Sequence, residues 1–290
     1  MRIRGFIHSF DLDNQIITIK YNNSIKRFYF QKSLFKNFKK FLSDREIIDL
    51  VSYDEEMNHG GIIAYQVMYV IELLMVLPKH NKIFYNKQNL NKEVKEFFNS
   101  LNYKLFIDTE MTMPNYYNDP AFIPELIQAG FFVENKKGEI VEKYNFHIRP
   151  TKAKFINSRT KKFLHLTSAV KKDEVSYYKF YNKFKSLLNK YKPAVITFGK
   201  NDKLFLESSY KTNNLPNLSF ITRFVNLSHI IKNYFELKND PGLFSLYEHY
   251  YSVKENQSHD ALEDAEVTKK VYDAFIKDIE SGNTKFKNEE

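Results

Sequence analysis

The 290-residue sequence contains no cysteine and no long apolar run. Without cysteine, the chain has no disulfide framework, no thiolate metal site and no thiol nucleophile. Its longest apolar stretch, residues 62–77, is interrupted by Gln66 and Glu72, which argues against a membrane-spanning helix. Acidic residues follow too soon after the N-terminus for a signal peptide. These absences predict a soluble, cytoplasmic protein.

Aromatic and basic residues are abundant instead. Apolar residues make up 43% of the chain and include 27 Phe and 20 Tyr, which excludes a wholly disordered protein. Lysine and arginine outnumber aspartate and glutamate by 44 to 35, and the net charge of +9 favours a polyanionic partner. An AT-rich genome produces the same richness in Lys, Asn, Ile, Tyr and Phe, so the distribution of the charge matters more than its sum.

The first 80 residues predict a small β-rich domain. Two strand-like runs flank Asp11–Asn14, whose composition is typical of a hairpin turn. A third strand, a helix and two more strand-like runs follow, and this order fits a five-stranded barrel of the oligonucleotide-binding type. The last run is also compatible with a buried helix. The predicted strands are Arg2–Phe10, Gln15–Tyr21, Ile25–Phe30, Glu46–Tyr53 and Ile62–Leu77, and the predicted helix is Ser33–Leu42.

Acidic residues are absent between Asn14 and Ser43, where basic and aromatic residues are interleaved. Basic groups can follow phosphates while aromatic rings stack on unpaired bases, so this stretch predicts a surface for single-stranded nucleic acid. The alternative is an aromatic core beneath a solvated lysine surface, and the sequence leaves both interpretations open. The candidate nucleic-acid-binding residues are Lys20, Tyr21, Lys26, Arg27, Phe28 and Tyr29.

A different pattern begins at Leu101, after a polar connector at residues 81–100. Strand-like and helix-like segments alternate up to residue 280, which predicts an α/β fold with a mixed sheet, and residues 281–290 are expected to form a flexible tail. The predicted strands are Lys104–Asp108, Ile127–Glu134, Ile140–Ile148 and Ala194–Phe198. The predicted helices are Ser176–Tyr191, a segment after Asp202, and Ala261–Ile279.

Asp108 and Glu110 end the first of these strands. Because side chains alternate along a strand, both carboxylates point to the same face, where they repel each other unless cations neutralise them. The pair therefore favours a metal site. The same D-x-E spacing is also common where a strand simply ends in a polar turn.

Asp264 lies on the apolar side of the last predicted helix. On a 3.6-residue wheel it is in line with Thr268, Val271 and Phe275, whereas most charged residues gather on the opposite face. A carboxylate on a buried stripe requires a partner, and a metal ion is one. The alternative is a first-turn acid favoured by the helix dipole. His259, five residues earlier, could flank the same site and accept a proton from water at neutral pH.

Asp202 follows an apolar strand that ends at Gly199 and stands at the start of a helix. In isolation this position fits an ordinary N-cap, for which aspartate is favoured. Asp202 is one of four acids that occur in order along the chain. The others are the two carboxylates of the strand and the one on the last helix. The series favours a shared site over four unrelated acids.

This combination resembles the DEDDh family of 3′–5′ exonucleases, which have a ribonuclease H-like fold. The match extends over residues 101–280 and rests on D-x-E in a strand, an aspartate at a strand-to-helix junction and H-x-x-x-x-D at the start of the last helix. Carried over residue by residue, the resemblance makes His259 the general base. It makes the metal ligands Asp108, Glu110, Asp202 and Asp264.

Further segments agree with the family pattern, and two positions depart from it. Ser168 replaces the usual glycine of L-T-G-I, and Met111–Met113 stand where small or polar residues are commoner, so the pocket for the terminal nucleotide is expected to differ. The most similar subgroup contains the small-RNA- and histone-mRNA-trimming exonucleases and their bacterial KapD-like relatives. The agreeing segments are Glu125–Gly130 (second strand), Phe146–Thr151 (F-x-x-P), Leu164–Val170 (L-T-G-I) and Gly242–Leu246 (G-L-x-x-L).

The resemblance implies cofactors and a reaction. Carboxylate oxygens select hard ions, so two Mg²⁺ or Mn²⁺ ions are expected. The implied reaction removes nucleoside 5′-monophosphates from the 3′ ends of single-stranded RNA or DNA, with RNA slightly favoured because of the subgroup. An inert nuclease fold acting as a nucleic-acid-binding adaptor and a nonspecific basic scaffold are the alternatives. The five retained motif residues argue against the first, and the inward-facing Asp264 argues against the second.

Overall fold

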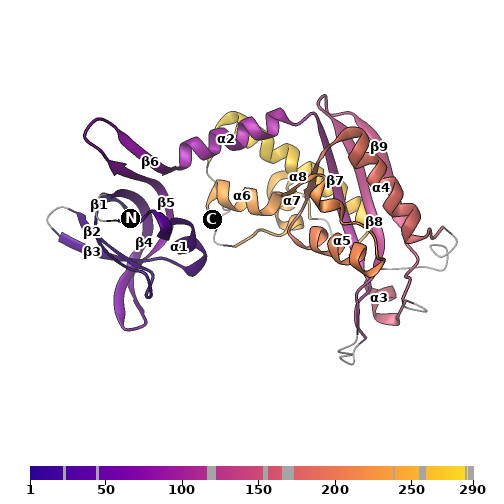
Figure 1. The fold of residues 1–290 in the computed structure, drawn as a ribbon, viewed down its shortest axis with the longest axis horizontal. Coiled ribbons are helices and arrows are strands. Elements are labelled where there is room, and N and C mark those ends of the chain that lie inside the picture. Colours follow the sequence, from indigo (N-terminus) through magenta and orange to yellow (C-terminus); the bar gives the residue numbers. More distant parts are fainter. Residues whose placement is uncertain are drawn as a thin grey trace. The chain divides into compact units, whose positions relative to one another are not determined.

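The computed structural model describes residues 1–21, 24–43, 46–115, 122–152, 156–164, 173–237, 239–254, 259–284 and 286. The chain divides into two compact units, Met1–Glu96 and Phe97–Glu290, and Figure 1 labels many of their elements. No helix within the described residues combines the length and the apolar composition that crossing a membrane requires.

The N-terminal unit contains a closed five-stranded barrel with a sixth strand beside it. The sheet order is β3-β2-β1-β4-β5-β6, and a parallel pairing of β3 with β5, with Phe28 opposite Tyr65, closes the ring of the first five strands. With a helix between the third and fourth strands, this is the topology of the oligonucleotide-binding barrel. The elements are β1 (Arg2–Asp11), β2 (Ile16–Tyr21), β3 (Ser24–Tyr29), α1 (Lys32–Phe38), η1 (Lys39–Phe41), β4 (Glu46–His59), β5 (Ile62–Val76) and β6 (Asn81–Asn86).

Alternating apolar residues explain why the first strands form a barrel. Ile3 and Ile7 of β1 are buried while Arg2 and Arg4 beside them are exposed, so one face of the strand lies in the core. The segment that is also compatible with a buried helix forms the strand β5 instead. It does so because it pairs with β4 on one side and with β6 and β3 on the other.

Residues 81–100, the predicted connector, form a strand and a helix. β6 pairs antiparallel with the end of β5, with Ile83 opposite Leu74, and α2 (Lys87–Ser100) follows directly. The polar composition that suggests a connector is that of an edge strand whose side chains are exposed or half-buried. The division between the two units falls within α2, after Glu96.

The C-terminal unit is built on a five-stranded mixed sheet with the order β11-β10-β7-β8-β9. β10 is parallel to β7 and β11, whereas β8 is antiparallel to β7 and β9, which confirms the ribonuclease H-like α/β fold. The elements are β7 (Tyr103–Met111), β8 (Leu126–Asn135), β9 (Ile140–His147), α3 (Ser158–Phe163), α4 (Tyr177–Tyr191), β10 (Ala194–Thr197), α5 (Asn201–Thr212), η3 (Leu218–Phe220), β11 (Arg223–Asn226), α6 (Leu227–Phe235), α7 (Leu243–Tyr251) and α8 (Ala261–Ser281).

The central strand β7 contributes side chains to both faces of this sheet. Leu105 and Ile107 join a core formed with α4 and α5. Phe106 points to the other face and packs edge-on against Tyr272 of α8, with the ring centroids 5.3 Å apart. Asp108 has the same parity along the strand as Phe106, so its carboxylate lies on the α8 side.

The sequence pattern alone does not predict α3, β11, α6 or α7. β11 has four residues and α3 has six, which is too short for a periodic apolar pattern to be recognised. α7 begins with the G-L-x-x-L segment, in which Gly242 is the N-cap residue. α6 follows β11 directly. Asn226, the last residue of β11, is the N-cap of α6, and its side chain accepts a hydrogen bond from the His229 N–H.

Candidate active site

Strand β7 supplies two acids. Asp108 and Glu110 share a face of the strand, and they lie opposite Gly130 and Gln128 of β8. On its other side, β7 is paired with β10 only as far as Phe106. The part of β7 that carries the acids therefore borders the loop and helix that follow β10.

Helix α5 brings Asp202 to this border. Its carboxylate Oδ1 accepts two hydrogen bonds from Thr109, one from the backbone N–H over 3.0 Å and one from Oγ1 over 2.8 Å. Asp202 is buried, and the N-cap residue of α5 is Lys200. The interpretation of Asp202 as an ordinary N-cap is therefore wrong, because its side chain is bonded to the strand of the D-x-E pair.

Helix α8 supplies Asp264, which is buried on the inner stripe as the helical wheel predicts. The start of the helix is fixed by its N-cap, Asp260, whose Oδ1 accepts bonds from the Leu262 and Glu263 N–H groups. Asp260 Oδ2 also accepts a bond of 2.7 Å from Gln128 Nε2 of β8. The cap therefore fastens the first turn of α8 to the sheet next to the acids of β7.

Gly130 permits this close approach of helix and sheet. A Cβ atom at Gly130 would lie 2.0 Å from the Leu262 nitrogen and 2.3 Å from the Ala261 carbonyl carbon, distances that backbone atoms cannot tolerate. Because Gly130 lies directly opposite Asp108, the first turn of α8 crosses the sheet at the level of the Asp108 carboxylate. The absence of a side chain at Gly130 is thus a condition for bringing α8 to this point.

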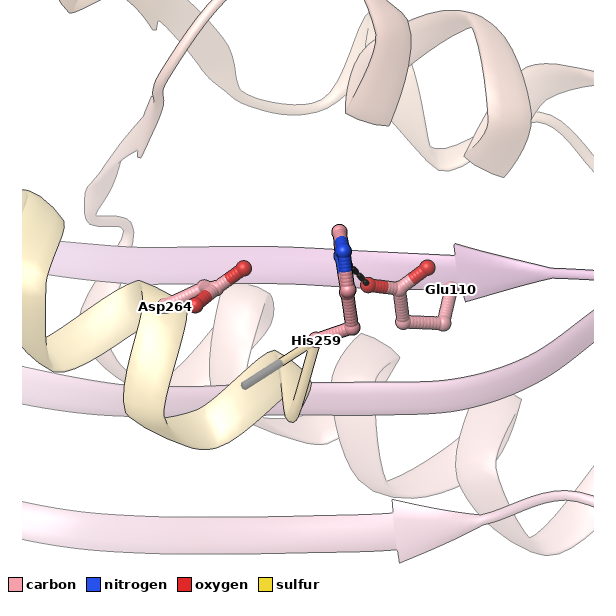
Figure 2. Close-up of side chains that lie close together, drawn as sticks. All are labelled: Glu110, His259 and Asp264. Atoms are coloured by element: carbon pink, nitrogen blue, oxygen red, sulfur yellow. Dashed lines mark ion pairs between the residues drawn. The ribbon is translucent and has the colours of Figure 1, made fainter. Parts of the chain in front are cut away.

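His259 stands immediately before the N-cap of α8, with a φ angle of +54°. Its Nδ1 atom lies 4.0 Å from Glu110 Oε1. Glu110, His259 and Asp264 can each offer one ligand atom such that all of these atoms lie within 4.8 Å of one another, and Figure 2 shows the three side chains. The helix start thus brings a histidine and an aspartate to the acidic end of β7.

Burial and mutual repulsion make these acids reluctant to ionise. Burial raises the pKa of Glu110 to about 8, and the charges of Asp264 and Asp202 add to the shift. Burial likewise raises the pKa of Asp202 to about 7, although hydrogen bonds from the strand favour its charged form. For Asp108, burial and then the charges of Asp202 and Asp264 hold the pKa well above its ordinary range. Such clustering of perturbed acids is typical of functional sites.

The composition of the cluster fits a divalent cation. Carboxylate oxygens are hard ligands of the kind that Mg²⁺ and Mn²⁺ prefer, and they come from three rigid elements, β7, α5 and α8. A cation would favour the ionised forms that burial and repulsion disfavour. Within the described residues, the group of potential ligand atoms comes from Glu110, His259 and Asp264, and the charges of Asp202 and Asp264 act on both Asp108 and Glu110.

The candidate nucleic-acid-binding residues of the N-terminal unit do not form one surface. Phe28 has no exposed area and lies in the barrel core, so its ring cannot stack on a base, and its inclusion in the set is wrong. Tyr29 is half-buried and stacks on His59 with the ring centroids 3.9 Å apart. Lys26 lies over the Tyr65 ring. Tyr21 is half-buried, and the exposed members of the set are Lys20 and Arg27.

The exposed members lie instead with two apolar residues that the sequence analysis does not single out. Lys20 is directly opposite Phe6 on one side and Ile25 on the other, and directly opposite residues of antiparallel strands share a face. The side chains of Phe6 and Ile25 are 52% and 55% exposed. We call Phe6, Lys20, Ile25 and Arg27 the outer β1–β3 face. Predicting this face from the sequence would have required the residue register between β1, β2 and β3.

Thr109, Gln128 and Gly130 support the site without carrying its motif. Gly130 and Gln128 both lie in the segment Glu125–Gly130, which resembles the family's second strand, whereas Thr109 has no such signal in the sequence. Of the L-T-G-I-like segment, only Leu164 lies within the described residues, and Ser168 lies outside them.

Comparison with known proteins identifies the family. Residues 105–272 match the exonuclease family RNase_T. The chain is 31% identical over 169 residues to the probable 3′–5′ exonuclease KapD of Bacillus subtilis (strain 168), and the match covers 58% of this chain and 82% of that protein.

Two solved structures have a similar fold. The nuclease domain of 3′hExo, a DEDDh family member, bound to rAMP, gives a TM-score of 0.54 at 19% identity, covering 66% of this chain and 98% of the other. Cell-death related nuclease 4 (CRN-4) gives 0.53 at 17% identity, covering 63% of this chain and 65% of the other. Since the family match spans more than half of the chain and includes all five motif residues, the chain belongs to the RNase_T exonuclease family and is a 3′–5′ exonuclease of the DEDDh type.

Proposed function

We propose that the C-terminal unit hydrolyses single-stranded nucleic acid from its 3′ end with two Mg²⁺ or Mn²⁺ ions, RNA slightly in preference to DNA. The proposal is supported by the four carboxylates of β7, α5 and α8, whose charges act on one another, and by His259 beside Glu110. Buried acids that repel one another are costly in a folded chain unless a cation binds them. Bound rAMP in the 3′hExo nuclease domain is consistent with an RNA substrate.

In the proposed reaction, the bound ions would polarise the scissile phosphodiester and favour ionisation of the attacking water. His259 would accept the water proton at Nε2, because Nδ1 faces Glu110. The water oxygen forms a bond to phosphorus while the bond from phosphorus to the 3′-oxygen of the preceding nucleotide breaks. The departing 3′-oxygen takes a proton from solvent, so the products are a nucleoside 5′-monophosphate and a strand that is one nucleotide shorter, with a 3′-hydroxyl end.

The direct test follows 5′-labelled single-stranded RNA and DNA of one sequence in Mg²⁺ or Mn²⁺. Wild type should produce a ladder that shortens from the 3′ end, faster on RNA, and Asp108→Ala or Asp264→Ala should abolish it. Glu263→Ala is the matched control, since Glu263 is an exposed acid adjacent to Asp264 and should be dispensable. Retained binding with no cleavage in either metal would favour the inert adaptor instead.

We also propose that the N-terminal barrel binds the single strand through the outer β1–β3 face. Lys20 and Arg27 can contact phosphates, and the exposed ring of Phe6 can stack on a base, a contact typically contributing about 1–3 kcal/mol. The tests are the affinity for a labelled oligonucleotide and the number of nucleotides removed per encounter. Both should fall in Lys20→Ala/Arg27→Ala, while the cleavage rate of bound strand should not. Unchanged affinity in this variant would refute the proposal.

A further inference from the structure

Helix α3 adjoins the active site although it carries none of the five motif residues. Its N-cap Asn157 donates from Nδ2 to the Met113 carbonyl over 2.6 Å, and the Met113 N–H donates to Thr160 Oγ1 over 2.9 Å. Thr160 is fully buried, and both bonds are partly buried. Met113 follows Glu110 on the same stretch of chain, so these bonds fix α3 to the end of the strand that carries the acids.

Phe163, the last residue of α3, contacts the imidazole of His259. The two ring centroids are 4.1 Å apart and the planes are inclined by 34°. The imidazole also has Glu110 as a neighbour, at 4.0 Å from Nδ1, a contact that Figure 2 marks with a dashed line. His259 therefore has an aromatic neighbour from α3 and a carboxylate neighbour from β7.

The backbone of His259 adopts a conformation that needs support from its surroundings. A φ angle of +54° is in the left-handed region, which costs a residue with a Cβ atom about 1 kcal/mol or more. Such conformations persist where neighbouring groups determine them, and they are frequent at functional sites. Phe163 is one of these neighbours. Its side chain is 40% exposed, so its contact with His259 is not that of an ordinary core residue.

We propose that Phe163 is a positioning residue whose ring fixes the orientation of the His259 imidazole above the acids of β7. The inference rests on the proposed role of His259 as the acceptor of the water proton. Without the ring, the imidazole can adopt other rotamers, and misplacement of a reacting group by about 1 Å lowers a rate by as much as about 100-fold. Phe163 acts through His259 and needs no contact with the substrate.

A double-mutant cycle tests this coupling. Single-turnover rates and substrate affinities are measured for wild type, Phe163→Ala, His259→Ala and the double variant, with Mn²⁺ at saturation. Phe163→Ala should slow cleavage by about 10- to 100-fold with substrate affinity unchanged, and Phe163→Tyr should restore most of the rate. In the His259→Ala background, Phe163→Ala should slow cleavage no further. Phe220→Ala removes a ring that is 86% exposed in the same unit and serves as the control.

Three results would overturn the inference. Losses that multiply in the double variant would mean that Phe163 does not act through His259. A loss of substrate affinity without a loss of rate would make Phe163 a binding residue for the nucleobase. A loss of Mn²⁺ affinity in Phe163→Ala would mean that the metal site itself is disturbed. Phe163→Leu, which keeps an apolar side chain, replaces Phe163→Ala in the cycle if the latter fails to fold.

The cycle also separates this inference from the proposed function. If His259→Ala cleaves as fast as wild type, His259 is not the proton acceptor, and both the proposed role of His259 and the positioning by Phe163 fail. If His259→Ala is slow while Phe163→Ala keeps the wild-type rate, the role of His259 stands and only the inference about Phe163 fails.

Discussion

Thr109 binds Asp202 twice, through its backbone N–H and its side-chain hydroxyl, and both bonds end on the same carboxylate oxygen. The contact joins β7 to the first turn of α5 across 93 positions of the sequence. Outer groups that orient metal ligands are typically worth about 10- to 100-fold in metal affinity or activity. Residues of β7 therefore contribute to the site from both faces of the strand. The even-numbered Asp108 and Glu110 supply carboxylates, and the odd-numbered Thr109 orients the carboxylate of Asp202.

Replacing Thr109 tests this coupling. Thr109→Val keeps the shape of the side chain and the backbone bond but loses the hydroxyl, and we expect Mn²⁺ affinity and cleavage rate to fall by about tenfold. Thr109→Ser retains the hydroxyl and should stay close to wild type. Calorimetric Mn²⁺ titration and single-turnover cleavage measure the two effects. Equal Mn²⁺ affinity in the Val and Ser variants would show that the hydroxyl does not orient Asp202.

Gly130→Ala should damage both stability and activity. The new Cβ would overlap the backbone of the first turn of α8, which must shift, and overpacking of this kind costs about 1–3 kcal/mol or more. Because Asp264 and His259 move with that turn, cleavage should fall by more than tenfold. Gly242→Ala is the control, since its Cβ would meet only the Ser245 Cβ at 3.8 Å. Urea unfolding and cleavage assays compare the two, and equal losses in both would contradict the prediction.

Stability without metal should decline as the pH rises. The pKa values of Glu110 and Asp202 are raised to about 8 and about 7, so the folded state holds protons that the unfolded chain releases near its ordinary carboxyl pKa. The stabilisation of the folded state by these retained protons is complete below the carboxyl pKa of the unfolded chain, about 4. It is lost as the pH rises through the pKa values of the folded state. In EDTA, the melting temperature should therefore fall between about pH 5 and about pH 8.5.

Two comparisons check that pH dependence. Mn²⁺ binds the ionised acids, so its stabilising effect should be larger at about pH 8.5 than at about pH 5. Glu110→Gln removes one titrating group and should flatten the decline in EDTA, whereas Glu263→Gln, at an exposed position, should not. A wild-type melting temperature in EDTA that rises over this pH range, with no difference between the two variants, would contradict the assignment.

Two phenylalanines of the barrel should respond in opposite ways. Phe28→Ala opens the core and is expected to destabilise the N-terminal unit by about 3–5 kcal/mol. Phe6→Ala removes an exposed ring, so it should leave the stability nearly unchanged while weakening oligonucleotide binding. Thermal unfolding and fluorescence anisotropy measure the two properties. Binding that is insensitive to Phe6→Ala would remove this ring from the proposed surface.

Asp108, Glu110 and Asp264 could be placed on their faces because each lies in a regular element with a readable period. The stripe that places Asp264 inward and the alternation that pairs Asp108 with Glu110 are local, and the structure confirms both faces. Phe28 was ambiguous because an aromatic residue in a strand fits a core and a binding surface equally well, and only the closure of the barrel decides.

Other parts depend on contacts that the sequence does not encode locally. The role of Asp202 is determined by Thr109 on a distant strand, and that of Phe163 by a ring contact between a short helix and the residue before α8. The edge strand β6 has a polar composition because few of its side chains enter the core. In each case the decisive partner is far away in the sequence, so periodicity and composition give no signal.

The acids of the site come from β7, α5 and α8, which are far apart in the sequence. A fragment of the chain therefore contains the whole site only if it includes all three elements. A polypeptide that ends before His259 keeps three of the four carboxylates but loses both groups that α8 and its approach contribute. A polypeptide that begins after Glu110 loses the first two acids. Proteolytic cleavage between Glu110 and His259 should therefore yield fragments without nuclease activity, whereas removal of Met1–Glu96 leaves all five motif residues on one polypeptide.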